Sequence, residues 1–120
     1  MENKRVFTNE ELIEKALTWF NMIIEDCDRL TSGNVSHESC IIRGRALRSK
    51  EFIEKHSKDP GEEIISLIIQ WFDSVIGFTK EITTGNVSHY GPLIKWHCKN
   101  SIYYIENYGR SSKKEAVEEV

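Results

Sequence analysis

The strongest constraint on this chain is a heptapeptide that occurs twice. Residues 31–37 read TSGNVSH and residues 83–89 read TTGNVSH, so the two copies begin 52 positions apart. The same offset aligns the flanking segments, and 16 of 48 positions are identical between residues 10–57 and residues 62–109. Agreement at this level over one fixed offset indicates an internal duplication, in which each half of the chain is one copy of a structural unit.

The first segment of each unit has the periodicity of an amphipathic helix. Thr8 and Glu11 have the spacing of a capping box at its start, and Gly33 suits the left-handed position beyond its end near Leu30. Asp26 falls outside the apolar arc of about 160°. The apolar positions within that arc are Leu12, Ile13, Ala16, Leu17, Phe20, Ile23, Ile24, Cys27 and Leu30.

The second segment of the first unit predicts a helix that starts at Asn34 or Ser36, both good N-cap residues, and ends near His56. Its apolar positions are Ile41, Ile42, Ala46, Phe52 and Ile53.

The second unit repeats this pattern after a strong break at residues 57–61. Asp59 and Pro60 predict a cap and a first helical residue, and Glu62 completes a second capping box. In the last helix the pair Gly91-Pro92 predicts a delayed or kinked start.

Two helical hairpins in tandem predict an all-α fold, a four-helix bundle with pseudo-twofold symmetry. We expect one helical domain over residues 1–109, with repeat one at 8–57 and repeat two at 59–109. The tail, residues 110–120, is expected to be disordered or a frayed helix. In an up-down-up-down bundle the first and third connections share one end, so the two heptapeptides should lie side by side.

Composition narrows the class of protein. The 120 residues carry a net charge of −3, which disfavours DNA binding. The longest apolar run, Ile64–Ile69, is too short to span a bilayer, and no signal-like segment follows the N-terminus, so we expect a cytoplasmic protein without a membrane partner. Three cysteines, an odd number, are expected to be reduced, partly buried thiols.

The heptapeptides allow two interpretations. As plain connectors, Gly ends one helix, Asn or Ser caps the next, and the hydroxyl groups satisfy free backbone groups. As a binding site, they would bring two helix N-termini together beside polar side chains, a place suited to a phosphate, a carboxylate or a nucleotide. The candidate ligand-binding residues are Asn34, Ser36, His37, Arg45, Arg48, Asn86, Ser88, His89 and His97.

Metal binding and catalysis are less well supported by the sequence. His37 and Cys40 have a plausible ligand spacing, but the counterpart of Cys40 is Pro92, and His37 with His89 would need a borrowed carboxylate. Cysteine and histidine neighbours on one helix do not face each other as nucleophile and base. We therefore expect no enzyme, no catalytic residue, no metal and no cofactor.

Arg45 is unusual because it projects within an apolar arc. It either snorkels or pairs with an acidic residue such as Asp28 or Glu38, or it contacts a ligand in a groove between helices. Arg43, Arg48 and Lys50 make the same helix basic.

The last helix carries Trp96, Ile102 and Tyr103 outside its inward arc. Leu67 and Phe78 widen the apolar surface of the same half. An exposed aromatic strip of this kind is typical of an interface, so we expect a homo-oligomer.

Two functional hypotheses follow. The first is a non-enzymatic cytoplasmic protein that oligomerises and binds an anionic, nucleotide-like small molecule at the paired GNVSH loops, as a sensor or a sequestering protein. The alternative is a protein-interaction module, such as a small inhibitor, an immunity protein or a phage or mobile-element counter-defence protein. The first requires His37, His89 and Arg45, whereas the second requires Trp96 and Tyr103.

Overall fold

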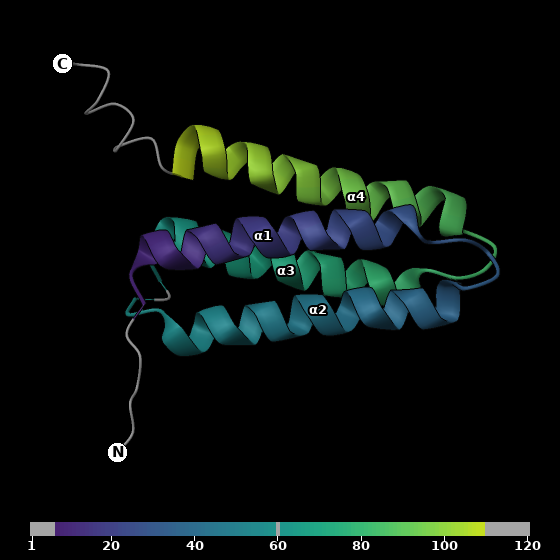
Figure 1. The fold of residues 1–120 in the computed structure, drawn as a ribbon, viewed down its shortest axis with the longest axis horizontal. Coiled ribbons are helices and arrows are strands. Elements are labelled where there is room, and N and C mark those ends of the chain that lie inside the picture. The colour runs from purple at the N-terminus through teal and green to yellow at the C-terminus, as the bar shows by residue number, and fades with distance from the viewer. Residues whose placement is uncertain (1–6, 60, 110–120) are drawn as a thin grey trace.

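Four antiparallel helices form the fold (Figure 1). The computed structural model describes residues 7–59 and 61–109, and it contains no strand in these ranges. The helices are α1 (Asn9–Asp28), α2 (Val35–His56), α3 (Glu63–Glu81) and α4 (Val87–Tyr104), followed by a π-helical turn η1 (Ile105–Gly109). Helices α1 and α3 each pack against both α2 and α4. The predicted all-α four-helix bundle is confirmed; the expectation for residues 110–120 lies outside the described residues.

The start of α1 is the predicted capping box. The Glu11 backbone N–H donates to Thr8 Oγ1 at 3.1 Å, and the Thr8 backbone N–H donates to Glu11 Oε1 at 2.9 Å. The helix ends at Asp28, two residues before the predicted Leu30. Helix α2 ends at His56, as predicted.

Aromatic residues at equivalent positions of the two repeats make contacts with each other or with similar geometry. Phe20 and Phe72, which occupy equivalent positions, stack with ring centroids 4.3 Å apart and an interplanar angle of 8°. Trp19 meets Phe52 edge-on at 5.5 Å, and at the equivalent positions Trp71 meets Tyr104 edge-on at 5.5 Å. The equivalent positions thus make equivalent contacts, while the duplication itself remains an interpretation of the sequence.

The predicted start of α3 is wrong. The helix begins at Glu63 with Glu62 as N-cap, and Glu62 makes no side-chain cap bond. Asp59 Oδ1 instead accepts the Gly61 backbone N–H at 3.1 Å, and the Asp59 carbonyl accepts the Glu62 backbone N–H at 3.0 Å. The Asp59 side chain is used to form a turn, so the helix starts later.

Of the two effects predicted for Gly91-Pro92, a delayed or a kinked start of α4, the delay is also wrong. The helix begins at Val87 and runs through Pro92. Because proline has no backbone N–H, the Ser88 carbonyl cannot receive the usual helical bond from position 92. Proline near a helix start is tolerated more easily than in the middle, and here the first helical turn forms ahead of it.

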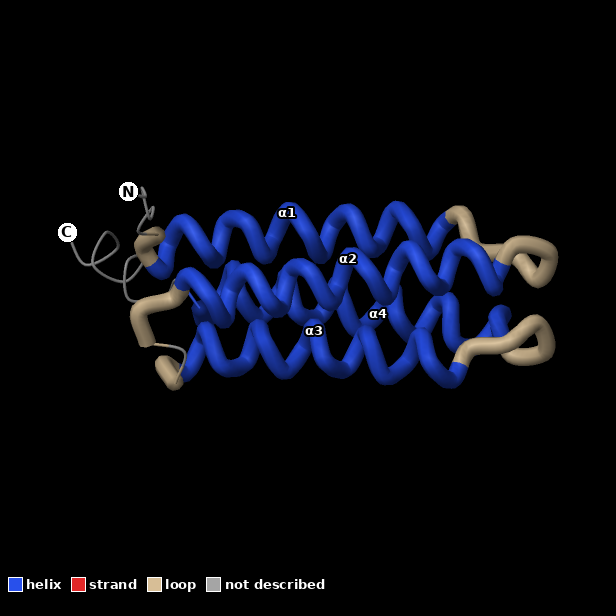
Figure 2. The backbone as a smooth tube through the Cα atoms, turned by 90° about the horizontal axis from the view of Figure 1, so that it is seen from below, coloured by secondary structure: helices blue, strands red, loops and turns tan. Residues whose placement is uncertain are grey.

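Both heptapeptide loops lie at the same end of the bundle, close to each other in two perpendicular views (Figures 1 and 2). Their predicted proximity is confirmed, because residues of both loops line one cleft. Within the described ranges, no helix has the length and apolar character needed to cross a bilayer.

Candidate functional site

The first heptapeptide loop is held together by its own side chains. Asn34 Oδ1 accepts the Thr31 backbone N–H at 2.8 Å, and Asn34 Nδ2 donates to the Arg29 carbonyl at 2.8 Å. Thr31 Oγ1 accepts the backbone N–H groups of Gly33 and Asn34, both at 3.2 Å. The Asn34 amide therefore satisfies backbone groups that the end of α1 leaves free.

The second loop repeats this network. Asn86 Oδ1 accepts the Thr83 backbone N–H at 2.6 Å, and Asn86 Nδ2 donates to the Glu81 carbonyl at 3.0 Å. Thr83 Oγ1 accepts the backbone N–H groups of Gly85 and Asn86. The repeated Thr and Asn thus specify one loop conformation, which the connector interpretation requires.

Two expectations about these loops are wrong. Asn34 occupies the N-cap position of α2, yet its side chain makes no cap bond because it reaches backwards into the loop. Gly33 does not adopt a left-handed conformation, and no glycine in the described residues has a positive φ. The Thr and Asn side chains close the loop without that conformation.

The polar residues that follow each loop are exposed. Ser36 and His37 lie in the first turn of α2, and Ser88 and His89 lie in the first turn of α4. The His89 ring meets the neighbouring Tyr90 ring edge-on at 5.3 Å. In the described part of the chain, no three His, Cys, Asp or Glu residues lie close enough together to hold a metal ion.

Arg45 forms an ion pair with a buried carboxylate. Its Nε donates to Asp26 Oδ2 at 2.7 Å, and Arg29 contacts the other oxygen of the same carboxylate. Asp26 is only 1% exposed. The expectation that Asp26 lies outside the buried face of α1 is therefore wrong. The expectation that Arg45 pairs with an acidic residue is confirmed, with Asp26 as the partner in place of Asp28 or Glu38. A helical projection of α1 alone does not show the guanidinium group that α2 supplies.

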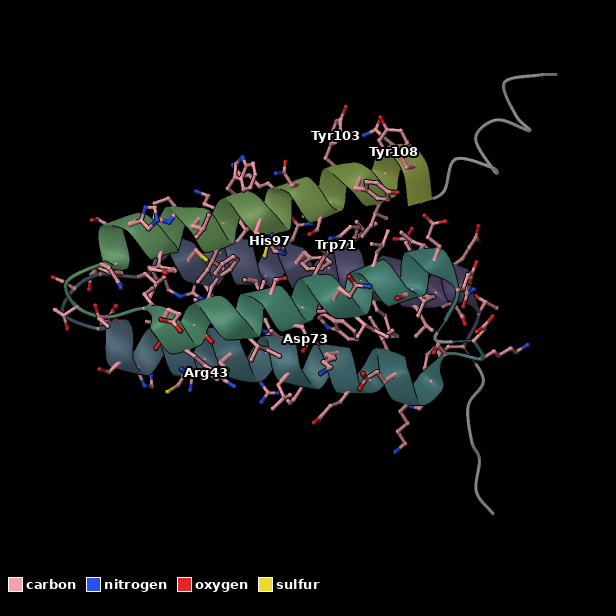
Figure 3. The ribbon with its side chains drawn as sticks, turned by 180° about the vertical axis from the view of Figure 1, so that it is seen from behind. Arg43, Trp71, Asp73, His97, Tyr103 and Tyr108 are labelled. Carbon is pink, nitrogen blue, oxygen red and sulfur yellow. The ribbon has the colours of Figure 1, made fainter. Side chains whose placement is uncertain are left out.

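His97, at the position equivalent to Arg45, lies against α3 (Figure 3). It hydrogen-bonds the Trp71 backbone, its ring meets the Phe78 ring edge-on at 5.7 Å, and its buried Nε2 has no hydrogen-bond partner among the described residues. Burial lowers the pKa of His97, and the Trp71 hydrogen bond partly opposes this shift. Since Phe78 is equivalent to Asp26, repeat two has a ring contact where repeat one has an ion pair.

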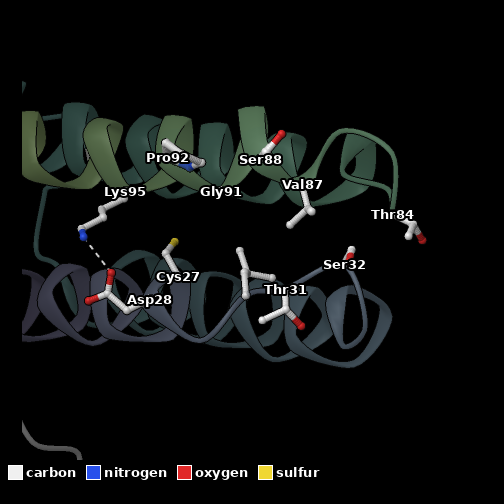
Figure 4. A pocket seen from close by; sticks show the side chains of 11 residues that line it. Cys27, Asp28, Thr31, Ser32, Thr84, Val87, Ser88, Gly91, Pro92 and Lys95 are labelled. Carbon is white, nitrogen blue, oxygen red and sulfur yellow. Dashed lines mark hydrogen bonds and ion pairs between the residues drawn. The ribbon is translucent and has the colours of Figure 1, made fainter.

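A cleft of about 660 Å³ lies between the end of α1 and the start of α4, with both loops at its side (Figure 4). Its charged residues, Lys95 and Asp28, form an ion pair with Nζ and Oδ1 2.7 Å apart. Of the nine predicted ligand-binding residues, Ser88 lines it. The full lining is Cys27, Asp28, Leu30, Thr31, Ser32, Thr84, Val87, Ser88, Gly91, Pro92 and Lys95.

The predicted ligand set is therefore not assembled in one place. Asn34 and Asn86 hold the loops, His97 packs against α3, and Arg45 and Arg48 lie in a separate groove between helices.

The opposite side of the bundle shows how the two repeats differ. Arg43, which is equivalent to Lys95, bridges α2 and α3. Its Nε donates to Thr79 Oγ1 and one terminal nitrogen donates to the Thr79 carbonyl, both at 3.0 Å. The counterpart of buried Thr79 is Cys27, and Lys95 pairs with Asp28 instead.

A second difference lies one turn earlier on α4. Gly91 lines the cleft, whereas its counterpart Ser39 carries a buried side chain. A Cβ added at Gly91 would lie 3.6 Å from Leu30 Cδ1. The sequence prediction rested on residues that the two repeats share, and it therefore missed the cleft. The positions at which the repeats differ, such as Gly91 and Ser39, could have indicated it.

The cysteine thiols are all free. Burial, with the nearby charges of Asp26 and Asp28, raises the pKa of Cys27 to about 12, so the thiol in the cleft stays neutral. Burial also raises the pKa of Cys98. Cys40 is exposed, contrary to the expectation of partial burial.

The outer face of α4 carries large exposed aromatic side chains. Trp96 is 60% exposed and Tyr103 is 61% exposed. Tyr103 and Tyr108 project outward from α4 and η1 (Figure 3). Ile102 does not belong to this strip, because it is half-buried and packs against the core.

Fold and site together define an all-α four-helix bundle with a cleft at its loop end. Comparison with protein families, curated proteins and solved structures finds no match to the chain.

Proposed function

We propose that this protein is a non-enzymatic, cytoplasmic binding protein that holds an anionic small molecule in the cleft between the end of α1 and the start of α4, beside the paired GNVSH loops. The cleft itself carries the proposal. Its volume of about 660 Å³ lies within the range of roughly 300–1,000 Å³ typical of small-molecule sites. Because burial keeps the Cys27 thiol of the lining neutral, retention of a ligand serves sensing or sequestration.

The lining combines an apolar surface with polar groups. Leu30, Val87 and Pro92 supply apolar contacts, and the hydroxyl groups of Thr31, Ser32, Thr84 and Ser88 supply hydrogen bonds. Such a mixture is typical of sites in which a few polar groups orient a largely apolar ligand.

Lys95 and the first turn of α4 favour an anion. The Lys95–Asp28 ion pair is well exposed, with 35% and 56% of the two side chains accessible, so exchanging Asp28 for a ligand phosphate or carboxylate costs little. Val87 and Ser88 lie at the positive end of the α4 dipole. Aromatic rings for stacking a nucleotide base are not among the lining residues, so an anionic molecule with an apolar body fits the cleft better.

The experiment is native mass spectrometry of the protein purified from its expression host. We expect a retained molecule of about 200–500 Da, the size range that such a site accommodates. Gly91→Leu fills the cleft and should abolish retention. Gly77→Leu is the matched control, because Gly77 is exposed on α3 with open space around its Cα.

The contribution of the Lys95 positive charge is tested by the same measurement of ligand retention. Lys95→Gln should weaken retention, whereas Lys99→Gln, an exposed lysine about one turn further along α4, should not. Retention that is equal in the Gly91→Leu and wild-type proteins would place the ligand elsewhere. A wild-type protein that carries nothing would favour the second candidate function.

The second candidate function is a protein-interaction module, such as an inhibitor, an immunity protein or a counter-defence protein. The exposed Trp96 and Tyr103, seven positions apart on α4, favour it.

The same exposed strip on α4 supports the proposed homo-oligomer. We expect light scattering after size exclusion to show an oligomer. The double variant Trp96→Ser with Tyr103→Ser should be a monomer, whereas Leu47→Ser, an exposed apolar control on α2, should leave the oligomer intact. A wild-type monomer at micromolar concentration contradicts the oligomer.

A further inference from the structure

A second cavity, a groove of about 250 Å³, lies between α1 and α2. It is lined by Trp19, Arg45, Arg48, Ser49 and Phe52. None of these residues lines the cleft at the loop end. Two arginines beside two aromatic rings form a combination that needs a separate explanation.

Arg45 is held in place before any ligand arrives. Its Nε and one terminal nitrogen bind the two oxygens of Asp26 at 2.7 and 3.5 Å, and its other terminal nitrogen lies 3.8 Å from Met22 Sδ. The Asp26 carboxylate is shared with Arg29. A guanidinium group fixed in this way binds an anion without a further loss of side-chain freedom.

Arg48 supplies a guanidinium group with no carboxylate partner in the described residues. It is exposed, and its guanidinium group lies over Gly44, where an added Cβ would come within 3.2 Å of a terminal nitrogen. Among the residues that the structure describes, Asp26 is the only carboxylate paired with this groove's arginines, so this set of groups carries net positive charge.

The groove is also lined by two aromatic residues, Trp19 on α1 and Phe52 on α2, one turn beyond Arg48. Trp19 and Phe52, both half-buried, meet edge-on at 5.5 Å with an interplanar angle of 76°. Lys15 Nζ lies 5.6 Å from the centre of the Phe52 ring and adds a further cation. A flat ring with an attached anion matches this combination of aromatic and cationic side chains.

Repeat two provides an internal comparison. Its equivalent aromatic pair, Trp71 and Tyr104, has the same 5.5 Å separation, but the positions of Arg45 and Arg48 are taken by His97 and Asn100. The aromatic packing therefore forms without the arginines, and the positive charge is specific to repeat one.

We propose that this groove binds a nucleoside monophosphate, with the base against Trp19 and Phe52 and the phosphate on Arg48 and Arg45. The volume suits one ring system and one phosphate rather than a triphosphate or a dinucleotide. The proposal is independent of the ligand proposed for the loop-end cleft, because the two sites share no residue.

The test is titration of the isotope-labelled protein with AMP, followed by the indole N–H signals in two-dimensional NMR. The Trp19 signal should shift with a Kd of about 0.1–1 mM, while the signal of Trp71, its counterpart, stays in place. Adenosine alone and inorganic phosphate alone should each bind at least about tenfold more weakly.

Variants separate the groove from the cleft. Arg48→Gln should weaken AMP binding by about tenfold or more, the usual effect of losing one charge-assisted contact. Lys55→Gln, an exposed cation further along α2, should change it by less than about twofold. Lys95→Gln should leave it unchanged. The same spectra report whether each variant is folded.

Several results would overturn the proposal. These are no Trp19 shift at about 5 mM AMP, far above the expected Kd, equal shifts of Trp19 and Trp71, or binding of phosphate as tight as that of AMP. Loss of AMP binding in Lys95→Gln with retention in Arg48→Gln would place the nucleotide in the cleft instead, which would support the proposed function and reject the groove.

Discussion

At the residue scale, the buried carboxylate of Asp26 is the charged group that matters most for the stability of repeat one. Its carboxylate is 1% exposed and contacts Arg45 and Arg29. We expect Asp26→Leu to lower the free energy of unfolding by about 2–4 kcal/mol, because Arg45 is left half-buried without a partner. Adding Arg45→Met should recover about half of that loss or more, since an apolar pair fills the same position. Urea denaturation of the wild type, of Asp26→Leu, of Arg45→Met and of the double variant gives the coupling free energy between the two residues.

The control is the ion pair between Lys50 and Asp73, with Nζ and Oδ1 2.8 Å apart, in which the carboxylate side chain is 53% exposed. Asp73→Asn should cost less than about 1 kcal/mol, as is usual for surface pairs. If Asp26→Leu costs no more than this control, the Asp26 interaction is not a buried ion pair in solution.

His97 gives the protein a pH dependence of known sign. Burial lowers the pKa of His97 in the folded protein, so the unfolded chain takes up a proton at a pH where the folded chain does not. The associated stability is complete above the unfolded pKa of about 6.5 and is lost as the pH falls towards the folded pKa. The midpoint of urea unfolding should therefore fall between about pH 7 and pH 5.

The variant His97→Phe should remove much of this decline, because phenylalanine does not titrate and its ring can keep the contact with Phe78. His37→Gln, which replaces an exposed histidine, is the matched control. A decline that persists in full in His97→Phe would assign the pH dependence to other groups.

At the scale of elements, the loops test the connector interpretation. Asn34→Ala removes one acceptor and one donor used by the backbone, so we expect a loss of about 1–2 kcal/mol. Asn34→Asp keeps the acceptor and should cost about half as much. Ser36→Ala, at an exposed position, should change stability by less than about 0.5 kcal/mol. Thermal and urea denaturation provide the measurements, and an Asn34→Ala protein as stable as Ser36→Ala would contradict the role of this amide.

The helices could be predicted because each depends on residues near one another in the chain. The Thr8–Glu11 capping box was correct, and the buried apolar positions of α1 fall within the predicted arc, which missed the buried Asp26. The start of α3 was wrong because the Asp59 side chain had two local uses, a helix cap and a turn, and sequence spacing does not choose between them.

The candidate sites depend on contacts between helices, which explains why they were predicted less well. The Asp26–Arg45 pair joins residues 19 positions apart, and the cleft depends on where Lys95 points and on the missing side chain at Gly91. The grouping of nine ligand-binding residues assumed that symmetry would bring them together. The structure instead separates the loop asparagines from the arginines of the groove.

At the scale of the whole molecule, the bundle consists of two hairpins that complete one core. Phe20 stacks on Phe72, and Arg43 of repeat one donates two hydrogen bonds to Thr79 of repeat two. The Arg43 contact is specific, because in a pair of identical first repeats Arg43 would face Cys27 instead. The interface between α2 and α3 therefore favours association of unlike repeats.

We therefore expect residues 1–58 and 59–120, produced as separate chains, to associate in a one-to-one complex. Each hairpin alone leaves its apolar face in water and should be weakly helical. Mixing should restore helical circular dichroism, and native mass spectrometry should show the mixed complex in excess over pairs of like chains. Arg43→Gln should reduce that excess, while Lys55→Gln serves as a control for loss of charge on the same helix. Pairs of like chains as abundant as the mixed complex would mean that the repeats are interchangeable and that the Arg43–Thr79 contact does not select the partner.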